Sequence, residues 1–268
     1  MSTTELDLPF IETQGRRLYD ALRTARTLAP LTDSHPDMTV EDAYHISLHM
    51  LRLREASGEH VIGKKIGVTS KPVQDMLGVF QPDFGFLTDS MEYEDGAAVS
   101  LKSAGLIQPR AEGEIAFMLK KDLQGPGVTK EDVLAATEWV APCFEIVDSR
   151  INDWKIKIQD TVADNASCGV FVIGKQHTDP ATLNLAAASM QMSKNGQPAG
   201  SGLGSAVQGH PAEAVAWLAN TLGAFGIPFK AGEVILSGSL APLVPAAAGD
   251  RFEMVIAGMG SCSIQFTE

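Results

Sequence analysis

The first 60 residues carry apolar side chains at helical spacing. Leu18, Leu22 and Ala25 lie three or four positions apart, and Pro30 is expected to end this helix. A second helix is expected after Thr39, because Asp42 three residues later completes a capping box. Gly58 should stop it. Its apolar stripe, which we interpret as packing, consists of Ala43, Ile46, Met50 and Leu53.

From His60 onward the pattern changes to short β-like runs separated by Gly, Pro and Asp. Short helices are expected to begin at Ser70, Thr129 and Pro211. After residue 90 the strands outnumber the helices and do not alternate with them regularly, which favours an α+β, mainly β architecture. The expected strands are His60–Val68, Phe84–Leu87, Glu112–Leu119, Phe144–Val147, Gly169–Ile173, Glu233–Leu236, Phe252–Ile256 and Ser261–Phe266.

The change of pattern suggests a division near residue 90. Residues 1–90 would form an accessory region, helical and then with short strands, and residues 91–268 a β-rich catalytic domain. One continuous unit is the alternative, because no low-complexity linker separates the two parts.

Composition narrows the functional classes. The chain has 268 residues and a formal net charge of −12, and with no basic run it is a poor candidate for nucleic-acid binding. Cys143, Cys168 and Cys262 are odd in number and widely spaced, which indicates a reducing compartment. Neither a signal peptide nor a membrane span is expected, so the protein is expected in the cytoplasm and not at a membrane.

Two carboxylates stand out in the strand expected at Glu112–Leu119. Glu112 and Glu114 should project from one face, because side chains in a strand alternate, while Ile115, Phe117 and Leu119 share the other face. Neighbouring carboxylates repel each other, and a hard cation such as Mg²⁺ or Mn²⁺ would relieve that repulsion. An edge strand with harmless exposed charges is the alternative.

A third carboxylate favours the metal-site interpretation. Glu145 stands within the apolar run Phe144–Val147, where an unpaired charge would be costly. The spacing does not reveal whether the two strands are neighbours.

Two further segments carry candidate catalytic groups. Lys64 and Lys65 should point to opposite faces of a strand, so Lys65 could face inward and stabilise an enolate or move a proton, unless both lysines are solvated. Asp83 is expected in a turn.

Weaker candidates lie in two loops. Asp164 belongs to a polar run at 160–167 that is either a substrate-binding loop or a plain loop. Ser237 and Ser239 follow an apolar strand, where backbone N–H groups could hold a carboxylate. The glycines at 200, 202 and 204 lack dinucleotide spacing, which disfavours NAD.

Five ordered motifs make the chain similar to the fumarylacetoacetate hydrolase superfamily, and the resemblance runs from about Leu18 to the C-terminus. Within it, the sequence resembles the 2-oxopent-4-enoate (2-hydroxypenta-2,4-dienoate) hydratases, with the 4-oxalocrotonate decarboxylases as near relatives. The motifs are Gly63-Lys-Lys-Ile-Gly-Val-Thr-Ser-Lys71, Gln81-Pro-Asp-Phe-Gly85, Pro109-Arg-Ala-Glu-Gly-Glu114, Phe144-Glu-Ile-Val-Asp-Ser-Arg150 and Asp160-Thr-Val-Ala-Asp-Asn-Ala-Ser167.

The resemblance implies a mixed β-roll or sandwich with an N-terminal helical region, and it implies roles for individual residues. Glu112, Glu114 and Glu145 match the family's Mg²⁺ or Mn²⁺ ligands, and Lys65 its active-site lysine. Asp83 matches an aspartate of the hydratases and thereby favours them over the decarboxylases. Ser237, Ser239 and Asp164 are the expected substrate-binding residues.

The resemblance implies a lyase of aromatic meta-cleavage catabolism. The dienol would be ketonised and water added at C4, giving 4-hydroxy-2-oxopentanoate. Decarboxylation of 2-oxohex-3-enedioate is the alternative reaction. A non-catalytic partner subunit is the alternative from another class. A homo-oligomer is expected, and association with a neighbouring pathway enzyme is a further possibility that the resemblance raises.

Overall fold

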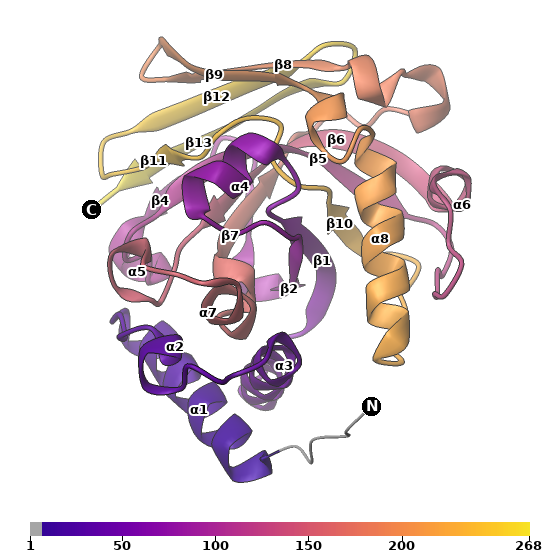
Figure 1. Cartoon of the computed structure of the whole chain (residues 1–268). Coiled ribbons are helices and arrows are strands. Elements are labelled where there is room, and N and C mark those ends of the chain that lie inside the picture. Colours follow the sequence, from indigo (N-terminus) through magenta and orange to yellow (C-terminus); the bar gives the residue numbers. More distant parts are fainter. Residues whose placement is uncertain (1–6) are drawn as a thin grey trace.

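A computed structural model describes residues 7–268, except for the side chain of Leu77. Within that range the chain forms two sheets and a set of mostly short helices (Figure 1). None of the helices in the described part is long and apolar enough to cross a membrane. The α-helices are α1 (Leu8–Thr24), α2 (Leu31–Ser34), α3 (Val40–Ala56), α4 (Lys71–Leu77), α5 (Leu101–Ala104), α6 (Lys130–Ala136), α7 (Ile158–Ala163) and α8 (Pro211–Ala224).

Single 3₁₀ turns lie between these elements. They are η1 (Asp89–Met91), η2 (Asn152–Trp154), η3 (Asn165–Ser167), η4 (Pro180–Thr182), η5 (Leu185–Ala187) and η6 (Gly204–Ala206).

The larger sheet has the strand order β2-β1-β10-β5-β6-β7-β3, and β11 pairs with β5 beyond this path. Its pairs are antiparallel except β1 with β10 and β3 with β7. The strands are β1 (Val61–Gly67), β2 (Asp83–Thr88), β3 (Glu92–Glu94), β5 (Arg110–Leu119), β6 (Thr137–Val147), β7 (Cys168–Ile173), β10 (Val234–Leu236) and β11 (Val244–Pro245).

This sheet is strongly curled. Strands β1 and β6 are three strand-to-strand steps apart, which is about 14 Å in a flat sheet. Lys65 Nζ on β1 nevertheless lies 3.0 Å from Glu145 Oε1 on β6. The face that carries these two side chains is therefore concave, and we call it the concave face.

The smaller sheet covers the opposite face of β5 and β6. Its strand order is β4-β13-β12-β8-β9, and it forms the upper layer in Figure 1. Gly113 lets the two sheets approach, because a β-carbon there would lie 2.7 Å from Met254 Sδ and 3.1 Å from Met190 Cε. Its strands are β4 (Ala98–Ser100), β8 (Ser189–Lys194), β9 (Gln197–Leu203), β12 (Arg251–Ile256) and β13 (Gly260–Thr267).

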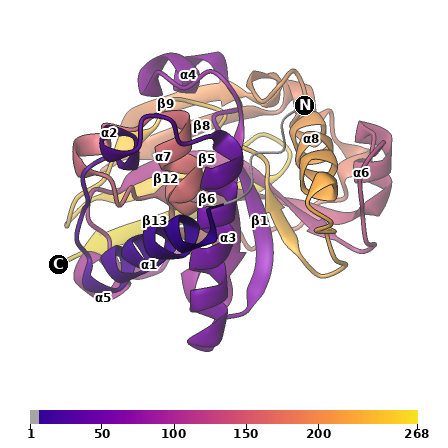
Figure 2. The same cartoon turned by 60° about the horizontal axis from the view of Figure 1, so that its bottom comes forward.

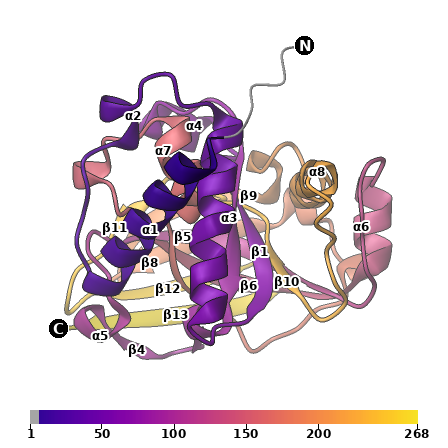
Figure 3. The same ribbon diagram turned by 90° about the horizontal axis from the view of Figure 1, so that it is seen from below.

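The N-terminal helices lie on the side of the molecule away from the smaller sheet. Helices α1 and α3 pack side by side, and α3 and α2 both contact α7 (Figures 2 and 3). Thr32 in α2 donates its hydroxyl to Asp160 at the start of α7, at 2.8 Å. Strands β1 and β2, which precede residue 90, pair in the same sheet as β5, β6 and β7.

The predicted α+β class is confirmed, and each predicted strand falls on an observed one. The bounds differ by one or two residues except in β6, which begins at Thr137 and not at Phe144. Thr39 and Asp42 form the predicted capping box. The first helix ends at Thr24 and not at Pro30, because Ala25 adopts a left-handed conformation and closes the helix. The hairpin of β8 and β9 was not predicted.

One buried ion pair fixes the loop between β6 and β7. Arg150 Nε donates to Asp164 Oδ1 at 2.6 Å, and the Arg150 backbone N–H donates to Asp164 Oδ2 at 2.8 Å. The two terminal nitrogens of the Arg150 guanidinium donate to the backbone carbonyls of Asp148, Cys168 and Asp164. Both side chains are essentially inaccessible to solvent, so every charge of the pair is satisfied inside the protein.

Removing one partner of this pair should destabilise the fold strongly. We expect Asp164→Ala to lower the free energy of unfolding by about 3–5 kcal/mol, because it leaves a buried guanidinium without its carboxylate. Urea unfolding followed by circular dichroism measures the change. The control is Asp75→Ala, which breaks the exposed Lys71–Asp75 pair and should cost less than about 0.5 kcal/mol. Equal effects of the two substitutions would contradict the structural role of Asp164.

Candidate active site

Three carboxylates meet on the concave face. Glu112 and Glu114 are two positions apart on β5 and point the same way, and Glu145 on β6 is the cross-strand partner of Glu112. Each of the three offers an oxygen within 4.8 Å of the other two, and all three are buried. Ile115, Phe117 and Leu119 lie in the core on the opposite face, as alternation predicted. The alternative of an exposed edge strand is therefore wrong.

Burial and mutual repulsion make these carboxylates costly to ionise. Burial, followed by the charge of Glu145, raises the pKa of Glu112 to about 8. Burial and the two neighbouring carboxylates raise the pKa of Glu114 well above its ordinary value. Burial also raises the pKa of Glu145, although the Lys65 ammonium opposes that shift. The three carboxylates and Lys65 together therefore need a further positive charge for all three glutamates to be ionised.

The donor set fits a hard divalent cation. Glu114 Oε1 and Glu145 Oε2 have no hydrogen-bond partner among the described residues, although both atoms are buried. Glu114 Oε2 accepts a hydrogen bond from the Gly238 backbone N–H at 2.8 Å, which orients this carboxylate. Three carboxylates and no nitrogen or sulfur ligand are typical of Mg²⁺ or Mn²⁺ sites that keep some water.

Lys65 stands beside the carboxylates, while Lys64 points to the other face and pairs with Glu233. Both lysine side chains are only about 2% exposed, so the alternative of a solvated pair is wrong. Burial alone would lower the pKa of Lys65, but the carboxylates of Glu145 and Asp83 outweigh burial and raise it. Lys65 is therefore a fixed positive charge on the concave face.

Asp83 is the first residue of β2 and is fully buried, so the prediction of a turn was wrong. Its Oδ2 accepts a hydrogen bond from Thr161 Oγ1 at 3.0 Å. Its Oδ1 has no partner among the described residues. A β-carbon on Gly67 would collide with this Oδ1 and lie 3.3 Å from Lys65 Nζ, which shows how closely the two charged groups approach each other. Burial raises the pKa of Asp83, and Lys65 partly offsets the shift.

Buried hydroxyl groups lie on the segments that follow Lys65 and adjoin Gly238. The side-chain oxygens of Ser237, Thr69 and Ser70 have no hydrogen-bond partner among the described residues. Thr69 packs against Gly238, whose φ of +106° and lack of a β-carbon permit this approach. Ser239, in contrast, donates to Ala241 O at 2.6 Å. Ser237 thus retains a free oxygen for a ligand, whereas the hydroxyl proton of Ser239 is already used.

Asp164 was predicted to bind substrate, and the structure gives it another role. Both of its carboxylate oxygens accept hydrogen bonds from Arg150. It does not line the cavity beside Lys65, which is bordered in this loop by Thr161, Ala166 and Ser167. Asp164 therefore holds the loop in place in this structure.

The cavity between these groups is small. Lys65, Asp83 and Glu112 are the charged residues of its lining. It measures about 20 Å³, room for about one water molecule, so a five-carbon acid can enter only when lining side chains move apart. The other lining residues are Gly67, Val68, Val73, Val147, Trp154, Ile156, Thr161, Ala166, Ser167 and Leu243.

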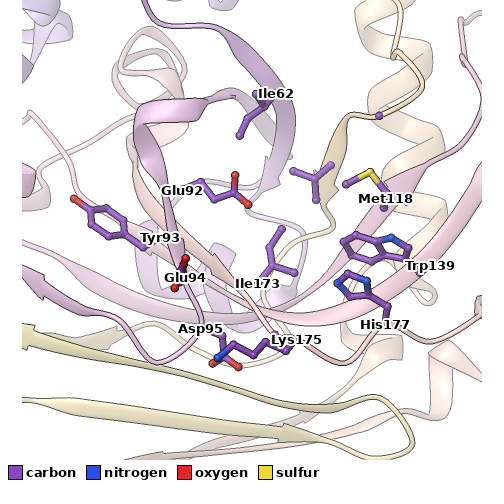
Figure 4. A pocket seen from close by; sticks show the side chains of 13 residues that line it. Ile62, Glu92, Tyr93, Glu94, Asp95, Met118, Trp139, Ile173, Lys175 and His177 are labelled. Carbon is purple, nitrogen blue, oxygen red and sulfur yellow. The ribbon is translucent and has the colours of Figure 1, made fainter.

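A much larger open cleft of about 810 Å³ lies at the opposite ends of β5 and β6. Figure 4 shows Met118 of β5 and Trp139 of β6 on its wall, and the Trp139 ring stacks on His177 at 3.7 Å. An apolar layer that includes Ala116, Cys143 and Leu236 separates this cleft from the carboxylates. The cleft contains none of the three glutamates, so the candidate active site is the smaller cavity.

Sequence reasoning missed several residues of this cavity. Thr161 stands in the polar run at 160–167, but nothing in that run indicated a hydrogen bond to Asp83. Outside the cavity lining, Thr69 and Ser70 also carry buried hydroxyls without a partner among the described residues, and their place in the motif that contains Lys65 was the one signal that could have marked them. Trp154 lies in an irregular loop, where no periodic pattern marks its position.

A family model described as "Fumarylacetoacetate (FAA) hydrolase C-terminal" matches residues 54–267. The chain belongs to the fumarylacetoacetate hydrolase family. This confirms the resemblance in the five motifs. Among solved structures, 4-oxalocrotonate decarboxylase from Pseudomonas putida G7, complexed with magnesium and adipate, superposes with a TM-score of 0.93 at 35% identity. That match covers 98% of this chain and 99% of the decarboxylase.

Two relatives within the family are named as hydratases. A 2-hydroxyhexa-2,4-dienoate hydratase from Comamonas testosteroni is 93% identical over 98% of this chain and 99% of its own length. A 2-hydroxypent-2,4-dienoate hydratase from Pseudomonas putida is 63% identical over 83% of this chain and 100% of its own length.

The raised carboxyl pKa values give the metal-free protein a distinctive pH dependence. The pKa of Glu112 is about 8 in the folded state against an ordinary 4.5, so the folded state binds more protons than the unfolded state between these values. We therefore expect the free energy of unfolding of chelator-treated protein to fall as the pH rises from about 5 to about 8. Urea unfolding at each pH measures this.

Glu112→Gln is the matched control, because the glutamine side chain does not titrate. We expect a shallower decline for this variant. A wild-type stability that is constant or rises over this pH range would contradict the assigned proton uptake.

Proposed function

We propose that this protein is a metal-dependent hydratase of short 2-hydroxy-2,4-dienoates, a hydro-lyase. The observation that carries the proposal is the convergence of three buried carboxylates with Lys65 and Asp83 at one cavity. Three anionic ligands suit a cation, an ammonium beside them suits a developing enolate, and a carboxylate with one free oxygen suits the activation of water. The two hydratases named above support the same reaction.

We propose Glu112, Glu114 and Glu145 as the ligands of a divalent cation, Mg²⁺ or Mn²⁺. When bound, the cation would act as a Lewis acid toward the carboxylate and the 2-oxygen of the substrate. It would also bring a positive charge that lets an acidic protein bind an anionic substrate. The related decarboxylase structure contains magnesium, which supports this choice of ion class.

Lys65 is proposed to stabilise the substrate oxygen at C2. Its ammonium is buried, has a raised pKa and stands 3.0 Å from Glu145, so it remains protonated at neutral pH. A fixed ammonium in a site of low dielectric stabilises negative charge that develops during ketonisation. The unpartnered hydroxyl of Ser237 is proposed as a hydrogen-bond donor to the substrate carboxylate, and Ser239 as a weaker contributor through its backbone.

Asp83 is proposed as the base that activates water for addition at C4. Thr161 occupies its Oδ2, which leaves Oδ1 directed to the same cavity as Lys65. Loss of the 2-hydroxyl proton and protonation at C5 give a 2-oxo-3-enoate, whose C4 is electrophilic. Water then adds at C4 and loses a proton to Asp83, and C3 of the enolate so formed takes up a proton to complete the addition. The product of 2-hydroxypenta-2,4-dienoate is 4-hydroxy-2-oxopentanoate, and the six-carbon homologue gives 4-hydroxy-2-oxohexanoate.

We place this reaction in the catabolism of aromatic ring-cleavage products, where short dienoic acids arise. Decarboxylation of 2-oxohex-3-enedioate is the second candidate, and the likeness to 4-oxalocrotonate decarboxylase favours testing it. The residues that line the cavity include Lys65 as their single cation. A second carboxylate would thus find no separate positive partner there, which supports the hydratase.

The proposed function is tested by mixing chelator-treated protein with freshly generated 2-hydroxypenta-2,4-dienoate or its six-carbon homologue, with and without Mg²⁺. We expect metal-dependent formation of the 4-hydroxy-2-oxo acid, identified by NMR because the dienol also tautomerises unaided. A parallel sample with 2-oxohex-3-enedioate tests for CO₂. Release of CO₂ without hydration of the dienols would replace the hydratase by the decarboxylase.

The role of Asp83 has its own test. We expect Asp83→Asn to lower kcat for hydration by about 10²–10⁴-fold, because asparagine cannot accept the proton of the attacking water. Mn²⁺ affinity, measured by titration calorimetry, should change little, since Asp83 is not among the three proposed ligands. Asp75→Asn, on the exposed face of α4, is the control. Unchanged turnover in Asp83→Asn would remove Asp83 from the mechanism.

A further inference from the structure

Arg110 is a cation at the edge of the active-site cavity that the proposed mechanism does not use. It opens strand β5 two residues before Glu112, so its side chain leaves the strand on the same face as Glu112 and Glu114. Its cross-strand neighbour on β6 is Val147, which lines the cavity. The strand register therefore directs Arg110 toward the end of the cavity beyond the carboxylates.

The Arg110 guanidinium has no anionic partner. Among the described residues it forms no ion pair, and no hydrogen bond from its side chain is found. It is half-buried. The Trp154 ring lies against it, with the ring centroid 4.3 Å from the guanidinium carbon. A desolvated arginine without a carboxylate is available to bind one.

The Trp154 indole lies between this guanidinium and the cavity. Trp154 lines the cavity, whereas Arg110 does not, although the two side chains are in contact. The indole Nε1–H donates to Gln108 O at 3.0 Å, which holds the ring in place. The backbone of Asp153 and Trp154 is left-handed, with φ values of 54° and 57°. Such strain is retained where the surrounding structure demands a particular position.

The same indole completes an apolar wall. Val73, Val147 and Leu243 form a small buried cluster against which Trp154 packs, and all four residues line the cavity. The wall lines the same cavity as Lys65 and Asp83, and we take it as the side that receives the substrate's far end when its carboxylate lies at the three glutamates. An alkyl end can be buried against this wall without losing hydrogen bonds to water. A second carboxylate there would lose its hydration and find no partner.

We propose that Trp154 is a specificity-determining residue that screens Arg110 from the substrate, so that the cavity selects 2-oxo acids with an apolar end over diacids. This inference rests on the proposed function, because that function sets the direction in which the substrate lies. Removal of the indole would expose Arg110 to the cavity and create a site for a second carboxylate. The substrate class of the wild-type protein is thus the monoacid dienoates.

The test compares two non-reacting ligands that differ only in the far end, 2-oxohexanoate and 2-oxoadipate. Titration calorimetry with the Mg²⁺-loaded protein gives both dissociation constants for wild type, Trp154→Leu, Arg110→Gln and the double variant. We expect wild type to favour 2-oxohexanoate by about tenfold or more, since an unpaired carboxylate is costly to bury. Trp154→Leu should shift this ratio by about tenfold toward 2-oxoadipate, and the double variant should lose the shift.

Trp154→Phe is a more conservative variant that can be measured if Trp154→Leu does not fold. It should shift the ratio of dissociation constants in the same direction by a smaller factor. Trp139→Leu, in the larger cleft, is the matched control and should leave the ratio unchanged. A ratio unaltered by both Trp154 variants would overturn the inference. The inference would also be overturned if Arg110→Gln, with Trp154 intact, bound 2-oxoadipate more weakly than wild type does. Arg110 would then reach the ligand although the indole is present.

The two proposals fail in different ways. Absence of dienoate turnover would refute the proposed hydratase activity. The ratio of the dissociation constants of 2-oxohexanoate and 2-oxoadipate could still be measured. Turnover of dienoates with no Arg110-dependent change of that ratio would refute only the screening by Trp154.

Discussion

Three ionisable carboxylates buried within a few ångströms of one another are the constraint on which the rest of this structure depends. Glu112, Glu114 and Glu145 offer oxygens within 4.8 Å of one another, with Lys65 as the adjoining cation. Burial, followed by the repulsion between the carboxylates, raises the pKa values of the glutamates, and one ammonium does not balance three carboxylates. A divalent cation would relieve this deficit of positive charge, and its charge would also draw an anionic substrate to an acidic protein.

The fold supplies what this cluster requires. The curl of the larger sheet brings β1 close to β6, and the antiparallel register places Glu145 opposite Glu112. The smaller sheet covers the back of β5, where Gly113 permits close contact with Met254. The helical N-terminal region meets α7, whose Thr161 holds one oxygen of Asp83. Sheet, covering layer and helices thus all fix charged groups at one cavity.

Local patterns predicted much of this site, because the period of two in a strand is visible in the sequence. Glu112 and Glu114 on one face, and Lys65 turned away from Lys64, follow from alternation alone. The pairing of β5 with β6 was beyond such reasoning, since it depends on contacts between distant segments. Asp164 was predicted to bind substrate because it lies in a polar run. Its partner Arg150 is fourteen residues away in a loop with no periodic pattern, so the ion pair could not be predicted.

The missed hairpin has a similar cause. Strand β9 contains Gly200 and Gly202, residues that usually mark turns, and here Gly202 is needed because a β-carbon would collide with Leu240 O. Trp154 likewise gave no local signal, although it lines the cavity and contacts Arg110. Residues that act by covering or supporting others are recognised only once the chain is folded.

The central claim is that the three glutamates hold a divalent cation at the proposed catalytic site. Anomalous diffraction from crystals of the protein grown with Mn²⁺ tests it most directly. We expect one strong peak within bonding distance of an oxygen from each of Glu112, Glu114 and Glu145, on the side that faces Lys65 and Asp83. A Mn²⁺ peak bound elsewhere, with none between these carboxylates, would contradict the claim and with it the proposed mechanism.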